Sequence, residues 1–255
     1  MTYLNIAGYQ FVDLSTEFIA DLQILLKKKA AQDGIKGTIL LSTEGINLFL
    51  AGIENTAQQW MDDLRRFPEF SDLTFKLSRS NHLPFKKMIV RIKPEIISMY
   101  QSHIRPTQKT APYLEPEQLK QWYDQHKDMI VLDTRNDYEF ERGTFAHAIQ
   151  LNIQQFSDFP KAVEKLSDEM KKKPIVTFCT GGIRCEKAAA YLLEQGFSEV
   201  WQLKGGILNY FETCKAEYFH GDCLVFDGRV AVNTNLAAVV DSATDAKYTV
   251  ASLRK

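Results

Sequence analysis

The sequence is poor in cysteine and has no long apolar run. Its four cysteines, at positions 179, 185, 214 and 223, are too few for the disulfide framework of a secreted domain, and their spacing fits no common zinc pattern. No apolar stretch approaches the roughly 18–20 residues that cross a bilayer, and residues 1–10 lack the basic start and apolar core of a signal peptide. We therefore expect a reduced, cytoplasmic protein with no membrane partner and no metal.

The chain also lacks an overall excess of charge. Its net charge of −1, with 45% hydrophobic and 25% charged residues, is that of an ordinary globular protein, and 255 residues favour two domains. Between Arg79 and Lys109, however, seven basic residues face one acidic residue, with Phe85, His82 and Tyr100 among them. Cations and aromatic rings are what contacts to single-stranded RNA require, although a solvated strand face and a polar linker would look the same.

We therefore expect RNA, and not DNA, as the nucleic-acid partner. The candidate contact residues are Lys86, Lys87, Arg91, Lys93 and Arg105. Because side chains alternate along a strand, Lys87 and Arg91 share one face and Lys86 lies on the other.

The first 97 residues carry the pattern of a split βαβ domain. The apolar periodicity predicts strands and helices in the order β-α-β-β-α-β, with a further short strand. The expected strands are 3–12, two within 37–50, 73–77 and 88–92, and the helices are 15–31 and 55–67. This is the ferredoxin-like, or acylphosphatase-like, arrangement. Residues 98–116 lack periodicity and contain three prolines, so we expect a linker there.

From residue 117 to 216, strands and helices alternate regularly. Strands are expected at 129–133, 148–153, 175–178 and 199–203, and helices at 117–125, 138–142, 159–166, 185–195 and 208–214. This alternation is typical of a parallel sheet with helices on both faces. Residues 217–255 form a C-terminal extension with two strand-like pieces, 223–226 and 229–232, and a weakly ordered end after 235.

One loop of this second domain carries chemistry. Cys179 ends an apolar strand, and the loop Cys179-Thr180-Gly181-Gly182-Ile183-Arg184 leads directly into a helix. Amides of such a turn and the helix N-terminus converge on one point, where a thiol loses its proton more easily. Four residues separate Cys179 from Arg184, one fewer than in the related phosphatase loop. The tighter ring of amides suits a single sulfur or oxygen atom on the cysteine, whereas an inert buried cysteine is the alternative.

The second domain resembles a rhodanese domain in four stretches. They are Val131-Leu-Asp-Thr-Arg-Asn-Asp-Tyr-Glu-Phe-Glu-Arg-Gly143, Ala148-Ile-Gln-Leu-Asn-Ile153, the loop at 179–184, and Val200-Trp-Gln-Leu-Lys-Gly-Gly-Ile207. The resemblance implies a reactive Cys179 and an Arg184 that helps to hold an anion. Asp133 and Arg135 would support the pocket at its rim, although an aspartate at a strand end often only caps the next turn.

The whole chain is similar to a narrower family, the bacterial tRNA uridine hydroxylases that join a ferredoxin-like domain to a rhodanese domain. The similarity lies in Ser42-Thr-Glu-Gly-Ile-Asn47, Phe85-Lys-Lys-Met-Ile-Val-Arg-Ile-Lys-Pro-Glu-Ile96 and Gly221-Asp-Cys-Leu-Val-Phe-Asp-Gly-Arg-Val230. It implies oxygen-dependent conversion of the wobble uridine (position 34) to 5-hydroxyuridine, with the tRNA anticodon stem-loop as partner. No cofactor is evident in the sequence. The resemblance implies molecular oxygen as the oxidant and an unidentified electron donor.

Two chemical schemes and two rival functions remain open. The Cys179 thiolate could add to C6 of uracil, or Cys179 could cycle through a sulfenic acid with Cys185 as the resolving thiol, unless Cys185 only packs inward. A sulfurtransferase with a Cys179 persulfide fits the loop but leaves the first domain unexplained. A non-catalytic RNA-binding module would not be expected to keep both Cys179 and Arg184.

Overall fold

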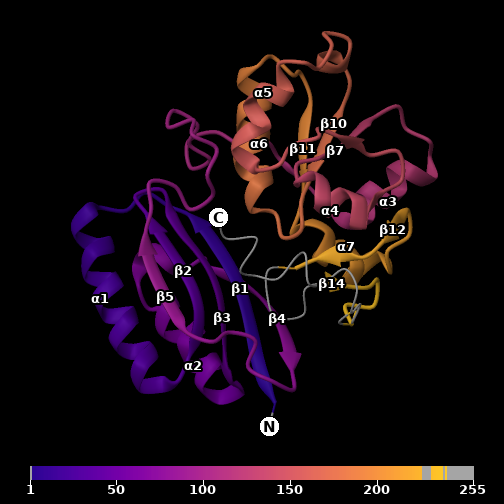
Figure 1. Cartoon of the computed structure of the whole chain (residues 1–255). Helices are drawn as coiled ribbons and strands as arrows, with labels where there is room; N and C mark the ends of the chain where they lie inside the picture. The colour runs from indigo at the N-terminus through magenta and orange to yellow at the C-terminus, as the bar shows by residue number, and fades with distance from the viewer. Residues whose placement is uncertain (1, 226–230, 238, 240–255) are drawn as a thin grey trace. The chain divides into compact units, whose positions relative to one another are not determined.

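The structure is a computed structural model that describes residues 2–225, 231–237 and 239 (Figure 1). The chain forms two compact units, which divide between Ser98 and Met99. None of the helices in these described ranges combines the length and the apolar character that a bilayer crossing needs.

The first unit is a five-stranded sheet with two helices. Its elements are β1 (Tyr3–Phe11), α1 (Thr16–Asp33), β2 (Lys36–Ser42), β3 (Gly45–Ile53), α2 (Glu54–Arg65), a 3-10 turn (Pro68–Phe70), β4 (Thr74–Ser80) and β5 (Met88–Ile92). The strand order is β4-β1-β3-β2-β5, and β5 joins the edge by pairing parallel to β2. The predicted ferredoxin-like order is confirmed.

Alternation along the strands places the core of this unit on one face of the sheet. Ile39 of β2, Leu48 of β3 and Val90 of β5 are buried there together with Leu22 of α1 and Trp60 of α2. The helix α1 begins where the Ser15 hydroxyl accepts a hydrogen bond from the N–H of Phe18, and it ends at Gly34. The opposite face of the sheet therefore carries the alternate residues of each strand.

The second unit is built on a parallel sheet. Its elements are β6 (Tyr113–Leu114), α3 (Pro116–Asp124), β7 (Ile130–Asp133), α4 (Asp137–Arg142), β8 (Gly143–Phe145), β9 (Ile149–Gln150), α5 (Phe159–Val163), β10 (Ile175–Phe178), α6 (Ile183–Glu194), β11 (Val200–Leu203), α7 (Gly206–Cys214), β12 (Phe219–Gly221), β13 (Cys223–Leu224) and β14 (Ala231–Val232), with 3-10 turns at Phe156–Asp158 and Met170–Lys172. The order β6-β11-β10-β7-β9 places β10 in the centre, and all four pairings are parallel. The predicted parallel α/β sheet is confirmed.

The structure differs from the expected elements in three places. Strand β6 lies inside the segment 98–116, because two residues that pair with β11 leave no periodic pattern in a sequence. The antiparallel pair of β8 with β12 was not expected either. The strands expected at 148–153, 223–226 and 229–232 are observed over fewer residues, as β9, β13 and β14. Residues 226–230 of the two later strands, and residues 240–255 of the expected weakly ordered end, lie outside the described ranges. The domain boundaries at 97, 116 and 216 stay a prediction.

Candidate active site

Cys179 lies at the carboxyl end of the central strand. It follows β10 directly, and α6 begins four residues later at Ile183. The strand end is tied to β7, because both the N–H and the hydroxyl of Thr134 donate to the carbonyl of Phe178, at 3.0 and 2.9 Å. Ligands of parallel α/β sheets bind at such carboxyl ends, so the cysteine occupies the position that the sequence predicts for it.

The first turn of α7 donates two backbone hydrogen bonds to the cysteine loop. The N–H of Ile207 donates to the carbonyl of Cys179 (3.0 Å), and the N–H of Leu208 donates to that of Thr180 (3.2 Å). In a trans peptide the C=O and N–H point in opposite directions, so the amides that follow these carbonyls turn away from α7. Gly206 permits the close approach: its φ is 67°, and a Cβ there would lie 2.4 Å from the Cys179 oxygen.

The Cys179 thiol is 1% exposed and strongly acidic. Burial alone would raise its pKa, but a hydrogen bond from Cys185, the charge of Arg184 and the backbone amides of Gly182 and Arg184 bring the pKa down to about 5. The N–H of Gly182 lies 3.1 Å from the sulfur. The surroundings of Cys179 thus lower the pKa of its thiol below the ordinary value and favour the thiolate, which is the form that acts as a nucleophile.

Cys185 packs inward beneath Cys179. It is fully buried in the first turn of α6, and its sulfur lies 3.8 Å from the hydroxyl of Thr134. Burial and the negative Cys179 raise the pKa of Cys185 well above its ordinary value, so it keeps its proton and donates it toward the Cys179 sulfur. Cys185 therefore packs inward and still contacts the Cys179 sulfur. The role of Cys185 as a resolving thiol stays a prediction.

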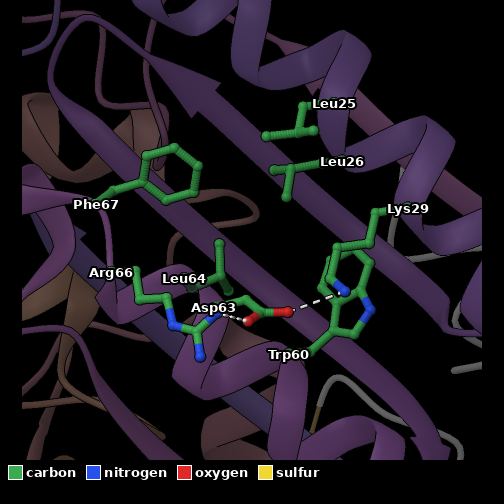
Figure 2. Close-up of a pocket in the computed structure, with 8 residues that line it drawn as sticks. All are labelled: Leu25, Leu26, Lys29, Trp60, Asp63, Leu64, Arg66 and Phe67. Atoms are coloured by element: carbon green, nitrogen blue, oxygen red, sulfur yellow. Dashed lines mark ion pairs between the residues drawn. The ribbon is translucent and has the colours of Figure 1, made fainter.

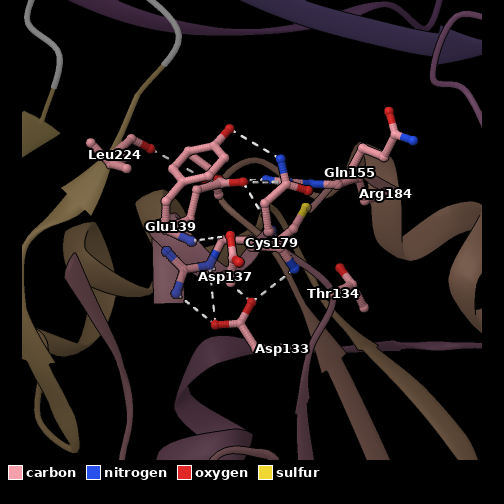
Figure 3. A network of polar contacts seen from close by, with 12 residues as sticks. Asp133, Thr134, Asp137, Glu139, Gln155, Cys179, Arg184 and Leu224 are labelled. Atoms are coloured by element: carbon pink, nitrogen blue, oxygen red, sulfur yellow. Dashed lines mark hydrogen bonds and ion pairs between the residues drawn. The ribbon is translucent and has the colours of Figure 1, made fainter. Parts of the chain in front are cut away.

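Arg184 binds a carboxylate of the protein itself. Its Nη1 and Nη2 lie 2.6 and 2.8 Å from the two carboxylate oxygens of Glu139, and both side chains are buried (Figure 3). Such a bidentate pair fixes the guanidinium plane. Glu139 thus holds the Arg184 guanidinium in position, and Arg184 acts on Cys179 through its positive charge. The expected contact of Arg184 with a bound anion stays a prediction.

Glu139 is a site residue that the sequence reasoning missed. It occupies the third position of α4, where its carboxylate also accepts the N–H of Asn136 at 3.2 Å. The hydroxyl of Thr180 lies 3.4 Å from the same carboxylate. Burial would raise the pKa of Glu139, but Arg184 holds it below the usual range. The spacing of Asn136 and Glu139 is a capping box, which was the available signal for it.

Asp133 and Arg135 support the loop region from inside the protein. They are 1% and 2% exposed, and Arg135 Nη2 lies 2.6 Å from Asp133 Oδ2. Arg135 also donates to the carbonyl of Gly143 (2.6 Å), and the hydroxyl of Thr144 donates to Asp133 (3.0 Å). Both side chains are buried where they join the end of β7 to the start of β8, and their support of a pocket stays a prediction.

One hollow of the first unit is lined by none of the predicted site residues. A cavity of about 290 Å³ lies between α1 and α2 (Figure 2). It is lined by Leu25, Leu26, Lys29, Trp60, Asp63, Leu64, Arg66 and Phe67. Asp63 pairs with both Lys29 (2.9 Å) and Arg66 (3.0 Å), so the charged side chains of the lining are engaged with one another. In the part of the chain that the structure describes, no three His, Cys, Asp or Glu residues gather where they could hold a metal ion.

The basic window of the sequence divides into separate groups. Arg79 lies on β4, at one edge of the sheet, and pairs with Glu54 at 2.6 Å. At the other edge, hydrogen bonds extend the pairing of β5 with β2 from residue 87 to residue 93. The basic residues that alternate with buried Val90 on this strand are Lys87, Arg91 and Lys93, and all three are exposed.

The remaining members of the window lie elsewhere. Lys86 is exposed just before β5. Arg105 lies in the second unit, in a hollow of about 150 Å³ that His103, Lys109 and Glu194 also line. Phe85, at 6% exposure, has no surface on which a base could stack, whereas Tyr100 is 73% exposed.

A parallel sheet with an acidic cysteine cradled at the end of its central strand defines a rhodanese-type domain. The family described as a rhodanese-like domain matches residues 115–213, and the family described as a UPF0176 acylphosphatase-like domain matches residues 3–96. The rhodanese-like domain of an Anabaena protein, a solved structure, is 22% identical, covers 43% of this chain and 79% of its own, and has a TM-score of 0.36.

Relatives that span both domains identify the family. A tRNA uridine(34) hydroxylase of Cupriavidus necator is 46% identical over 92% of this chain and 85% of its own length. Another, of Burkholderia mallei, is 44% identical over 94% of this chain and 83% of its own. The chain belongs to the tRNA uridine(34) hydroxylase family.

Proposed function

We infer that this protein is an oxidoreductase that hydroxylates uridine 34 of tRNA to 5-hydroxyuridine. The observation that carries the inference is the thiolate of Cys179, held in a ring of amides within a chain that aligns along most of its length with proteins of that name. The anticodon stem-loop, which contains position 34, is the part of the tRNA that would enter the site, and the cytoplasm is where it would do so.

The residues support a nucleophilic scheme. The Cys179 thiolate adds to C6 of the uracil ring and makes C5 electron-rich, and C5 then reacts with molecular oxygen. One oxygen atom replaces the C5 hydrogen as a hydroxyl, and the other leaves as water with two electrons and two protons from an external donor. Elimination of the thiolate restores the ring. The Arg184 charge and the loop amides stabilise the enolate while it carries negative charge.

Cys185 offers a second route. In this route the oxygen adduct at C5 is a hydroperoxide, and elimination of Cys179 from C6 frees the thiolate. The thiolate then takes the distal oxygen of the hydroperoxide with a proton, which leaves the C5 hydroxyl on uridine and a sulfenic acid on Cys179. The buried thiol of Cys185 contacts the Cys179 sulfur and condenses with the sulfenic acid, releasing water and forming a disulfide. An external dithiol would then reduce that disulfide.

The exposed face of β5 is our candidate surface for RNA. Lys87, Arg91 and Lys93 project from one side of the strand, and Lys86 adds a fourth charge beside them. Each cation can neutralise a phosphate and release its counterion. Arg105 would add a contact from the second unit.

A plain sulfurtransferase is not favoured. The similarity to the hydroxylases extends through the first domain, which a persulfide carrier of this kind would not need.

The test is the nucleoside content of tRNA from cells without the protein, complemented with the wild type, Cys179→Ser or Cys185→Ala. Cys179→Ser should leave 5-hydroxyuridine absent in both schemes, while Cys185→Ala abolishes it only in the sulfenic route. Loss of thiolated nucleosides in place of 5-hydroxyuridine would establish sulfur transfer and overturn the proposal.

A further inference from the structure

Only two residues of the cysteine loop face outward. Four of its six members are buried: Cys179, Thr180, Gly182 and Arg184. The other two, Gly181 and Ile183, are half-buried. A molecule that approaches the Cys179 sulfur from the loop side therefore meets Gly181 or Ile183 first.

The two glycines of the loop stand there for different reasons. Gly182 has a φ of 109°, a left-handed conformation that strains any side chain, so the backbone itself requires glycine. Gly181 is not among the residues with positive φ, and a Cβ built on it meets no heavy atom within 4 Å. The fold makes no demand for glycine at 181, and the volume that a side chain would fill there is open.

We propose that Gly181 is the specificity-determining position of the loop: its missing side chain leaves the space through which a pyrimidine ring reaches Cys179. The proposal rests on the proposed function. Addition to C6 requires the sulfur to approach the face of the ring to roughly 3–3.5 Å, so the ring must lie flat against the loop. Carbon atoms in contact are separated by about 3.5–4 Å, so a single methyl group at 181 occupies the layer that the ring needs.

The experiment compares a series of increasing size, Gly181→Ala, Gly181→Val and Gly181→Leu, in the full-length protein. Hydroxylation of tRNA should fall stepwise, by roughly 100-fold or more at Val, since a displacement of about 1 Å costs about that much. The Kd for tRNA should stay close to that of the wild type. Thermal unfolding of Gly181→Ala should also be unchanged, because the added Cβ meets no heavy atom within 4 Å.

A second readout separates access from a change in the loop. Each variant is treated with iodoacetamide, which is small, and with N-phenylmaleimide, which carries a planar ring, and modification of the Cys179 peptide is followed by mass spectrometry. Iodoacetamide should react at the wild-type rate with the wild-type pH dependence, while the maleimide reaction slows as residue 181 grows. Ile183→Ala, which widens the same opening, should leave the iodoacetamide reaction unchanged and speed the maleimide reaction.

Two results would overturn the proposal. Wild-type hydroxylation in Gly181→Val would show that the ring enters elsewhere. A parallel fall of both alkylation rates, or a shifted pH dependence, would show that the substitution distorts the loop. If the wild type itself fails to hydroxylate tRNA, the proposed function fails; a divergence of the two reagents along the series would then still establish Gly181 as the entry position.

Discussion

Replacement of Glu139 by alanine leaves the Arg184 guanidinium buried without its carboxylate. Arg184 is 5% exposed and Glu139 is fully buried, and both carboxylate oxygens receive a hydrogen bond from the guanidinium. Removing one partner of a buried ion pair costs about 3–5 kcal/mol of the free energy of unfolding. At about 2–4 °C per kcal/mol, this lowers the Tm of the second unit by roughly 6–20 °C.

The assay is urea unfolding followed by tryptophan fluorescence. In a Trp60→Phe background the remaining tryptophans, Trp122 and Trp201, both lie in the second unit and report on it alone. The matched control is Glu54→Ala in the chain that retains Trp60. It breaks an ion pair whose side chains are 44% and 65% exposed, and such a pair contributes about 0–1 kcal/mol.

The effect of Glu139 depends on pH with a definite sign. Its pKa is lower in the folded protein than in the unfolded chain, so its stabilisation is fully present above the ordinary value and is lost as the pH falls through the lower, folded value. The difference in the free energy of unfolding between the wild type and Glu139→Gln should therefore become smaller at acidic pH. A cost below about 1 kcal/mol for Glu139→Ala at pH 7 would refute the reasoning, because the buried guanidinium would then not depend on its bidentate carboxylate.

Three further predictions concern the thiol, its support and the RNA surface. Alkylation of Cys179 by iodoacetamide should rise with pH through a midpoint below that of an ordinary thiol, and Cys185→Ala, which removes a hydrogen bond to the thiolate, should move that midpoint upward; an unchanged midpoint would contradict the contact. Gly206→Ala should lower the Tm and raise the pKa of the thiol together, and a loss of stability without a change in pKa would mean that α7 does not shape the loop. Arg91→Ala should weaken tRNA binding and reduce the slope of log K against log salt by about 0.7–0.9, whereas the exposed Lys28→Ala should do neither; equal effects would place the RNA elsewhere.

Much of the fold could be predicted because it follows from local patterns. Alternating apolar residues identify the long strands of the first unit, and the regular succession of short apolar runs and helices predicts the parallel sheet of the second. Strand β6 and the pair of β8 with β12 could not be predicted in this way. Each has only two or three residues, and each exists because a distant segment offers backbone groups to pair with.

The site was predictable where chemistry and chain position coincide. Cys179 and its loop stand out because a cysteine, two glycines and an arginine occupy one strand-to-helix turn. Glu139 does not stand out in the sequence, because Arg184, which it binds, is 45 residues away. The spacing of Glu139 from Asn136 indicates a capping box, which points to a helix start and not to an active site. The grouping within the basic window could not be predicted from composition, since Arg79 on β4 and the cations of β5 lie on opposite edges of a sheet whose strand order the composition does not reveal.

The amides of Ile207 and Leu208 that hold the loop have a consequence for the timing of synthesis. A nascent chain that has emerged only to residue 200 contains the whole cysteine loop but not the helix whose first turn fixes two of its carbonyls. Since the ribosome adds residues from the N-terminus onward, the loop can take its final shape only after α7 follows. The backbone of the reactive loop is thus completed by a segment that is synthesised after it.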